Sequence, residues 1–77
     1  MEISGTMDDS CWRHMMFALL DQDVLAHFET EHCSFWGKVL SISSTDVGIE
    51  FIQPGTTDES EGNDIFAYQA FKKITIG

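Results

Sequence analysis

Basic residues, cysteines and prolines are all scarce in this chain of 77 residues. Only 4 residues are Lys or Arg against 13 Asp or Glu, so the formal net charge is −9. Counterion-release binding to nucleic acid requires clustered cations, so generic DNA or RNA binding is not expected. The 2 cysteines are too few for the disulfide framework of a small secreted domain. No membrane-length apolar run and no opening signal segment is present, which predicts a cytoplasmic protein without a membrane partner.

Aromatic residues, by contrast, are plentiful, with 6 Phe, 2 Trp and 1 Tyr. They supply the large apolar units that a single domain spanning 1–77 needs, because a chain this short lies near the lower size limit for independent folding. Homo-oligomerisation would add stability and is left open. The acidity has two interpretations: it keeps a small apolar protein soluble, or it steers the protein towards a basic surface on a partner.

The first part of the chain predicts a flexible lead over 1–7 and an amphipathic helix over 8–21. Candidate N-caps precede an apolar stripe with helical spacing. The stripe consists of Trp12, Met15, Met16, Leu19 and Leu20. Such a stripe is a groove-binding face or, as we favour here, part of the core.

In the rest of the chain, apolar and polar residues alternate over short segments, as they do in strands. This pattern predicts a barrel over 23–76. The expected strands are 23–30, 35–44, 47–52, 65–69 and 72–76, with an acidic loop over 54–64. Gly37 lies inside the second strand, where a glycine marks a bend or a close approach of two backbones. This order predicts an α+β, mainly β fold, with an N-terminal helix packed on a five-stranded, strongly bent antiparallel barrel.

Particular residues in the strands resemble those of a known family. Phe35, Gly37 and Val39 resemble the start of the first motif of the Sm-like (LSm) family, which places an apolar residue, a glycine and an apolar residue at alternate positions. Ile49 and Phe51 resemble the closing apolar pair of that motif, one residue late. A helix followed by five strands is also the element order of the family. The resemblance implies an Sm-like, SH3-like small barrel.

The positions that read RNA in the Sm-like family carry other residues in this chain. The family's Asp and Asn would fall near Ser43 and at about Val47 or Gly48, and its Arg-Gly pair would fall at Ala70-Phe71. The uridine pocket is therefore not expected. Within the superfamily, the acidity and the preceding helix resemble the Rof family of acidic inhibitors of the Rho termination factor. That resemblance implies a protein partner with a basic, nucleic-acid-binding surface.

Two groups of residues are candidates for binding such a partner. Acidic side chains would supply charge complementarity, and exposed aromatic side chains would give large contact areas. The acidic candidates are Asp58, Glu59, Glu61 and Asp64, and the aromatic candidates are Trp36 and Tyr68. Ordinary core packing is the alternative for both aromatic residues.

Residues with metal-binding or nucleophilic chemistry are present but lack the required pattern. The candidates are Cys11, His14, His27, His32 and Cys33. They do not form the paired clusters of a structural zinc site. A catalytic thiol needs cationic neighbours that lower its pKa, whereas the acidity of this chain would raise it. We therefore expect no catalytic, cofactor or metal site, and no enzyme.

The sequence thus predicts a non-enzymatic protein-interaction module. It would act as an acidic inhibitor or regulator that binds the basic surface of a partner protein. The alternative is a homo-oligomeric Sm-like ring that binds RNA or a small nucleotide ligand between its subunits.

Overall fold

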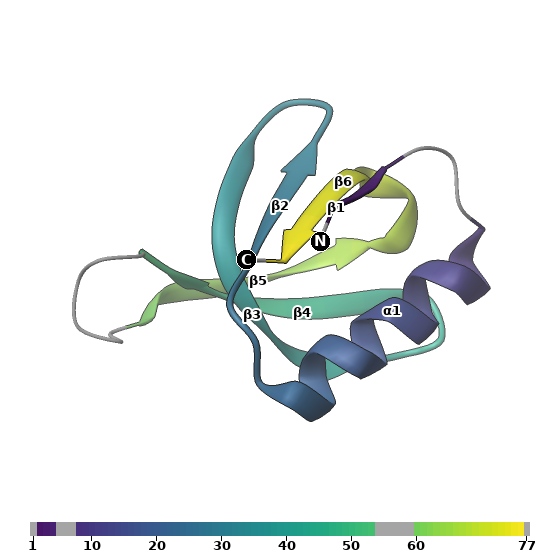
Figure 1. The fold of residues 1–77 in the computed structure, drawn as a ribbon, viewed down its shortest axis with the longest axis horizontal. Helices are drawn as coiled ribbons and strands as arrows, with labels where there is room; N and C mark the ends of the chain where they lie inside the picture. Colours follow the sequence, from purple (N-terminus) through teal and green to yellow (C-terminus); the bar gives the residue numbers. More distant parts are fainter. Residues whose placement is uncertain (1, 5–7, 54–59, 77) are drawn as a thin grey trace.

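The computed structural model describes residues 2–4, 8–53 and 60–76, which form an α-helix, a short 3-10 helix and a six-stranded antiparallel sheet (Figure 1). The elements are β1 (Glu2–Ser4), α1 (Asp9–Gln22), β2 (Ala26–Thr30), β3 (Ser34–Ile42), β4 (Asp46–Ile52), β5 (Ser60–Ala67), the 3-10 helix η1 (Tyr68–Ala70) and β6 (Phe71–Ile76). The sheet order is β1-β6-β2-β3-β4-β5. The predicted fold class, a helix followed by a mainly β antiparallel fold, is confirmed.

Helix α1 forms where its sequence predicts and buries the predicted stripe. The Asp8 carboxylate accepts a hydrogen bond from the Cys11 backbone N–H at 2.8 Å, which caps the first turn. The buried residues of the helix are Trp12, Met16 and Leu19, and they belong to the hydrophobic core. The helix packs against β3 and η1. The interpretation of the stripe as core is therefore confirmed.

Gly37 in β3 lies where two strands approach closely. It is buried and pairs with Phe51 of β4 on one side and Ala26 of β2 on the other. A Cβ atom at this position would lie 2.5 Å from the backbone oxygen of Glu50. Only a glycine fits there without moving a strand, so the predicted close backbone approach is confirmed.

The sheet curls strongly around its aromatic side chains. Phe35 of β3 and Phe66 of β5 have ring centroids 5.1 Å apart although β4 lies between their strands. Phe66 also contacts Phe71 of β6, with centroids 5.7 Å apart. Flat neighbouring strands are about 4.8 Å apart, so rings two strands apart meet this closely on the inner face of a curled sheet. Within residues 2–4, 8–53 and 60–76, no ladder joins the end strands β1 and β5, so closure into a barrel stays a prediction.

Two predicted non-strand segments are wrong in part. The flexible lead was expected over 1–7, but Glu2–Ser4 forms β1 and pairs with Lys73–Thr75 of β6. The acidic loop was expected over 54–64, but β5 already begins at Ser60. In both places a neighbouring strand offers free backbone N–H and C=O groups. Pairing with that strand satisfies the backbone hydrogen-bonding groups of the segment even where its own strand propensity is low. Residues 1, 5–7 and 54–59 lie outside the described part of the chain.

Smaller corrections concern the ends of strands. The first predicted strand begins at Ala26 rather than at Asp23, because Asp23 takes the left-handed conformation that ends α1, with φ of 53°. The fourth ends at Ala67, and Tyr68–Ala70 turns as η1 into β6. No helix in the described residues is long and apolar enough to cross a membrane.

Candidate functional site

A groove of about 510 Å³ opens along β3, β4 and β5. Its lining begins at Cys33 beside the β2–β3 turn and continues through Phe35 and Trp36 of β3, Phe51 of β4 and Phe66 of β5. No Lys or Arg is among the described residues that line it. Figure 1 shows α1 on the far side of the curled sheet from the β2–β3 turn, so the helix leaves this end uncovered. The volume lies within the range of about 300–1,000 Å³ that is usual for ligand clefts.

Three phenylalanines, one from each of the three strands, form an aromatic floor in the groove. Phe35 and Phe66 are stacked with an interplanar angle of 20°, and Phe51 stands edge-on to Phe35 at 80° with centroids 5.1 Å apart. All three side chains are half-buried. Residues two apart on a strand share a face, so Phe35 lies on the same face of the sheet as Gly37. Gly37 pairs with Phe51 of β4, so Phe51 lies on that face as well.

Two acidic side chains on β5 lie at the rim of the groove. Glu61 and Asp64 are both exposed and both line it. Asp64 shares a face with Phe66, two residues further along β5. The ladder between β4 and β5 shifts register between Glu50 and Ile52, which leaves Phe51 opposite the segment that contains Glu61. The carboxylates therefore stand beside the aromatic floor. Asp58 and Glu59, the other two acidic candidates, lie outside the described residues.

Trp36, like Glu61 and Asp64, is a predicted site residue that lies at the groove. It is half-buried and lines the groove. It also pairs with His27 of β2, and the two rings have centroids 4.9 Å apart. Because neighbouring residues on a strand point to opposite faces, the indole lies on the other side of β3 from the ring of Phe35.

Tyr68 does not lie at the surface, so the expectation that it anchors a partner is wrong for this conformation. It is 1% exposed and belongs to the core. Its hydroxyl donates a hydrogen bond to the backbone oxygen of Ser43 at 2.6 Å. Tyr68 begins the 3-10 turn η1 after β5, and its ring packs into the core there rather than lying at the surface.

Replacing Tyr68 by phenylalanine should therefore reduce stability without affecting partner binding. We expect a loss of about 1 kcal/mol of unfolding free energy, because Ser43 is exposed and water can replace the lost donor. Urea denaturation measures the loss. A variant of unchanged stability that binds its partner more weakly would contradict the structural role of this side chain.

The same residue should make stability depend on alkaline pH. Burial raises the pKa of Tyr68 above its ordinary value of 10.0. As pH rises past that value, the unfolded state loses its phenolic proton before the folded state does, so the folded state becomes less stable. The contribution is complete below the unfolded pKa and is lost from about pH 10 upward. Denaturation at several alkaline pH values should show a steeper fall for the wild type than for Tyr68→Phe.

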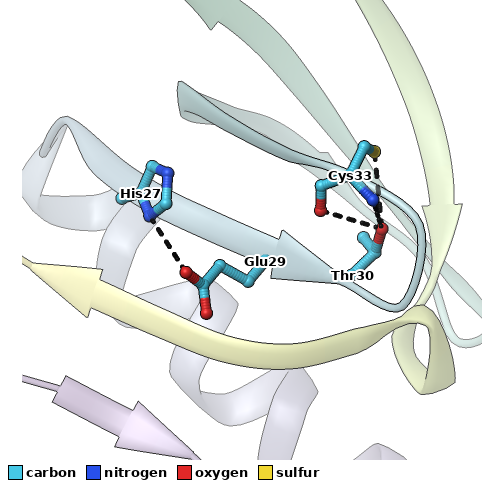
Figure 2. Close-up of polar contacts among 4 residues, drawn as sticks. All are labelled: His27, Glu29, Thr30 and Cys33. Carbon is cyan, nitrogen blue, oxygen red and sulfur yellow. Dashed lines mark hydrogen bonds and ion pairs between the residues drawn. The ribbon is translucent and has the colours of Figure 1, made fainter.

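The β2–β3 turn that carries Cys33 is closed by a backbone hydrogen bond from the Thr30 N–H to the Cys33 oxygen at 2.8 Å and is held further by the Thr30 hydroxyl. The Thr30 Oγ1 accepts from the Cys33 backbone N–H at 3.1 Å and from the His32 N–H at 3.3 Å. It also donates to the Cys33 backbone oxygen at 3.1 Å. Figure 2 shows the Thr30 and Cys33 side chains facing each other across the turn, with His27 and Glu29 earlier in β2. The exposed thiol of Cys33 therefore sits on an ordered turn at the groove.

Neither metal binding nor thiol catalysis gains support from the arrangement. No group of three or more His, Cys, Asp or Glu residues in the described segments could hold a metal ion. Hydrogen bonding to the Asp8 carboxylate, together with its charge, raises the pKa of the Cys11 thiol. The expectation that acidic neighbours raise a thiol pKa is confirmed at this residue. Cys11 is exposed.

Sequence reasoning missed the floor of the groove. Phe35 and Phe51 were interpreted as barrel positions, and Phe66 was not singled out. A signal existed, because each phenylalanine lies on a different strand and the strand of Phe66 follows the acidic segment directly. Only the register of β4 against β3 and β5 shows that the three rings lie together.

Comparisons with known proteins identify no relative. No family model matches the chain, and neither a curated protein nor a solved structure matches it. The resemblance to the Sm-like and Rof families stays a prediction.

Proposed function

We propose that this chain is a non-enzymatic protein-interaction module in which the groove along β3, β4 and β5 binds a basic surface of a partner protein. The observation that carries this proposal is an aromatic floor rimmed by carboxylates, with no basic residue among its described lining. In this role the chain acts as an inhibitor or regulator in the cytoplasm, and the surface it occupies is one that its partner uses for nucleic acid.

The groove has the composition of a recognition surface. Its phenylalanines are half-buried and held against one another, so little conformational entropy is lost when a partner covers them. The carboxylates of Glu61 and Asp64 are exposed beside them. A net charge of −9 raises the rate of encounter with a basic partner.

The distribution of the basic residues supports a protein partner over nucleic acid. Arg13 lies on α1, Lys38 on β3, and Lys72 and Lys73 lie on β6. None of the four lines the groove. A phosphate backbone at the groove would meet Glu61 and Asp64, and like charges repel there.

The position of β1 bears on the alternative function, a homo-oligomeric ring. A ring built by strand pairing needs a free strand edge on each side of the subunit, so that each subunit pairs with the next. β6 is paired with β2 on one side and β1 on the other, so the sheet ends at the three-residue strand β1 and the eight-residue strand β5. A ring through β6 would require β1 to leave its place. This pairing supports the interaction module.

Photo-crosslinking from the groove tests the proposal. A benzophenone maleimide is attached to Cys33 in the Cys11→Ser variant, and to Cys11 in the Cys33→Ser variant as the matched control. Both thiols are exposed, but only Cys33 lines the groove. In lysate at low salt, the Cys33 label should crosslink one partner and the Cys11 label should not.

The crosslink should disappear at high salt, because exposed charge pairs are screened. It should also compete with RNA for a nucleic-acid-binding partner. Equal labelling from both positions, or a crosslinked partner without a basic surface, would argue against the proposed function.

A further inference from the structure

We propose that the groove receives one arginine side chain of the partner, with the planar guanidinium over the phenylalanine floor and paired with the carboxylates of Glu61 and Asp64. This inference rests on the proposed function and specifies the chemistry of its contact. The occupant is a cationic side chain because both charged residues on the rim are acidic.

The phenylalanines offer ring faces in two orientations. Phe35 and Phe66 are nearly parallel, with an interplanar angle of 20°. Phe51 lies at 80° to Phe35 and at 76° to Phe66. A flat cation that lies along either orientation meets the face of a ring, where the negative quadrupole attracts it.

The carboxylates on the rim are available to a cation. The Asp64 Oδ1 accepts a hydrogen bond from the Ile65 backbone N–H at 2.8 Å, which orients the carboxylate and leaves Oδ2 without a partner among the described residues. The Lys38 Nζ lies 4.0 Å from the Asp23 Oδ2, and the His27 Nδ1 lies 4.0 Å from the Glu29 Oε1. Neither contact involves Glu61 or Asp64.

Arginine fits this combination better than lysine. Its guanidinium is planar and weakly hydrated, stacks on aromatic faces and pairs with carboxylates through two parallel N–H groups. The ammonium of lysine is a strongly hydrated point charge and loses more on entering an apolar groove. A groove of about 510 Å³ has room for one long side chain and the backbone that carries it.

An NMR titration of the full chain with N-acetyl-arginine methylamide tests the inference without knowing the partner. The citrulline analogue is the matched control, because it has nearly the same shape without the charge. Arginine should shift the backbone signals of Glu61 and Asp64 and the ring signals of Phe51 and Phe66. Citrulline should bind at least about fivefold more weakly, and lysine should fall between them.

Variants separate the two parts of the contact. Phe51→Leu keeps an apolar side chain but removes a ring, and Glu61→Gln removes a charge from an exposed position that should not affect folding. Each should weaken arginine binding by about threefold to fivefold, as expected for one cation–π contact or one exposed ion pair. Asp21→Asn, an exposed residue on α1 outside the groove, should leave binding unchanged.

The outcomes distinguish this inference from the proposed function. Equal shifts with citrulline, or arginine shifts that spread over acidic residues outside the groove, would overturn the arginine contact even if Cys33 still crosslinks a partner. Arginine binding confined to the groove would uphold the contact, even if no partner crosslinks from Cys33 and the proposed function falls.

Discussion

Replacing Gly37 by alanine should cost about 3 kcal/mol of unfolding free energy, the upper part of the usual range for an overpacked core site. The added Cβ would lie 2.5 Å from the Glu50 backbone oxygen and 2.8 Å from the Ile49 Cγ2. The first atom belongs to the backbone of β4 and the second to a side chain that is 0% exposed, so neither has space to withdraw. Strands β3 and β4 must therefore separate.

Urea denaturation followed by circular dichroism measures this effect. With a slope of about 1 kcal/mol per molar urea for a small domain, the midpoint should fall by about 3 M, or the variant should already be unfolded in water. Partner binding should be lost as well, because β3 and β4 carry Phe35 and Phe51. A midpoint within about 0.5 M of the wild type would show that the strands can move apart at little cost.

Gly48→Ala provides the matched control. A Cβ at this position would lie 2.5 Å from the Ser41 Oγ, and the next contact is an ordinary one of 3.8 Å. Ser41 is exposed and its hydroxyl can rotate away, so the cost should stay below about 1 kcal/mol. Adding Ser41→Ala should remove the cost. A Gly48→Ala variant as unstable as Gly37→Ala would show that any side chain on these strands is harmful.

Neutralising the acidic rim should weaken partner binding by about tenfold to twenty-fivefold. Each ion pair made by an exposed carboxylate is worth about threefold to fivefold in affinity, and the two factors multiply. The variant Glu61→Gln with Asp64→Asn removes both carboxylates from exposed positions and should not affect folding. Isothermal titration calorimetry with the purified partner that crosslinking identifies measures the change in affinity.

The control variant carries the same change in net charge elsewhere. Asp21→Asn with Asp23→Asn removes two exposed carboxylates at the C-terminal end of α1, where negative charge opposes the helix dipole. It also removes the contact of Asp23 with Lys38, which contributes little because the Asp23 side chain is 82% exposed. Asparagine also tolerates the left-handed conformation of residue 23. This variant should bind within about threefold of the wild type, as expected for screened, distant charges. An equal loss in both variants would mean that total charge, and not the groove, determines affinity.

The elements that could be predicted from the sequence are those whose signals are local. The stripe of Trp12, Met16 and Leu19 predicted α1 as a helix against the core, and Gly37 predicted the close approach of β3 to its neighbour. Both signals depend on residues within a few positions of each other. The structure confirms both: the helix residues are buried in the core, and the backbone of Glu50 approaches Gly37 too closely for a side chain.

The elements that could not be predicted depend on partners distant in sequence. β1 is a strand only because Ile3 meets Ile74 near the other end of the chain. The first half of β5 is polar and acidic, and β4 imposes its extended conformation through pairs such as Glu50 with Asn63. The groove follows the same rule. Its acidic residues stood out in the sequence, but the aromatic floor exists only once the register is known.

The salt dependence of partner affinity tests the central claim most directly. The dissociation constant of the wild type and of Glu61→Gln with Asp64→Asn is measured from low to high salt. The wild-type affinity should fall steeply as salt rises, and that of the variant should start lower and change less, because its groove has lost the charges that salt screens. A wild-type affinity that is flat over the same range would contradict an acidic groove that binds a basic surface.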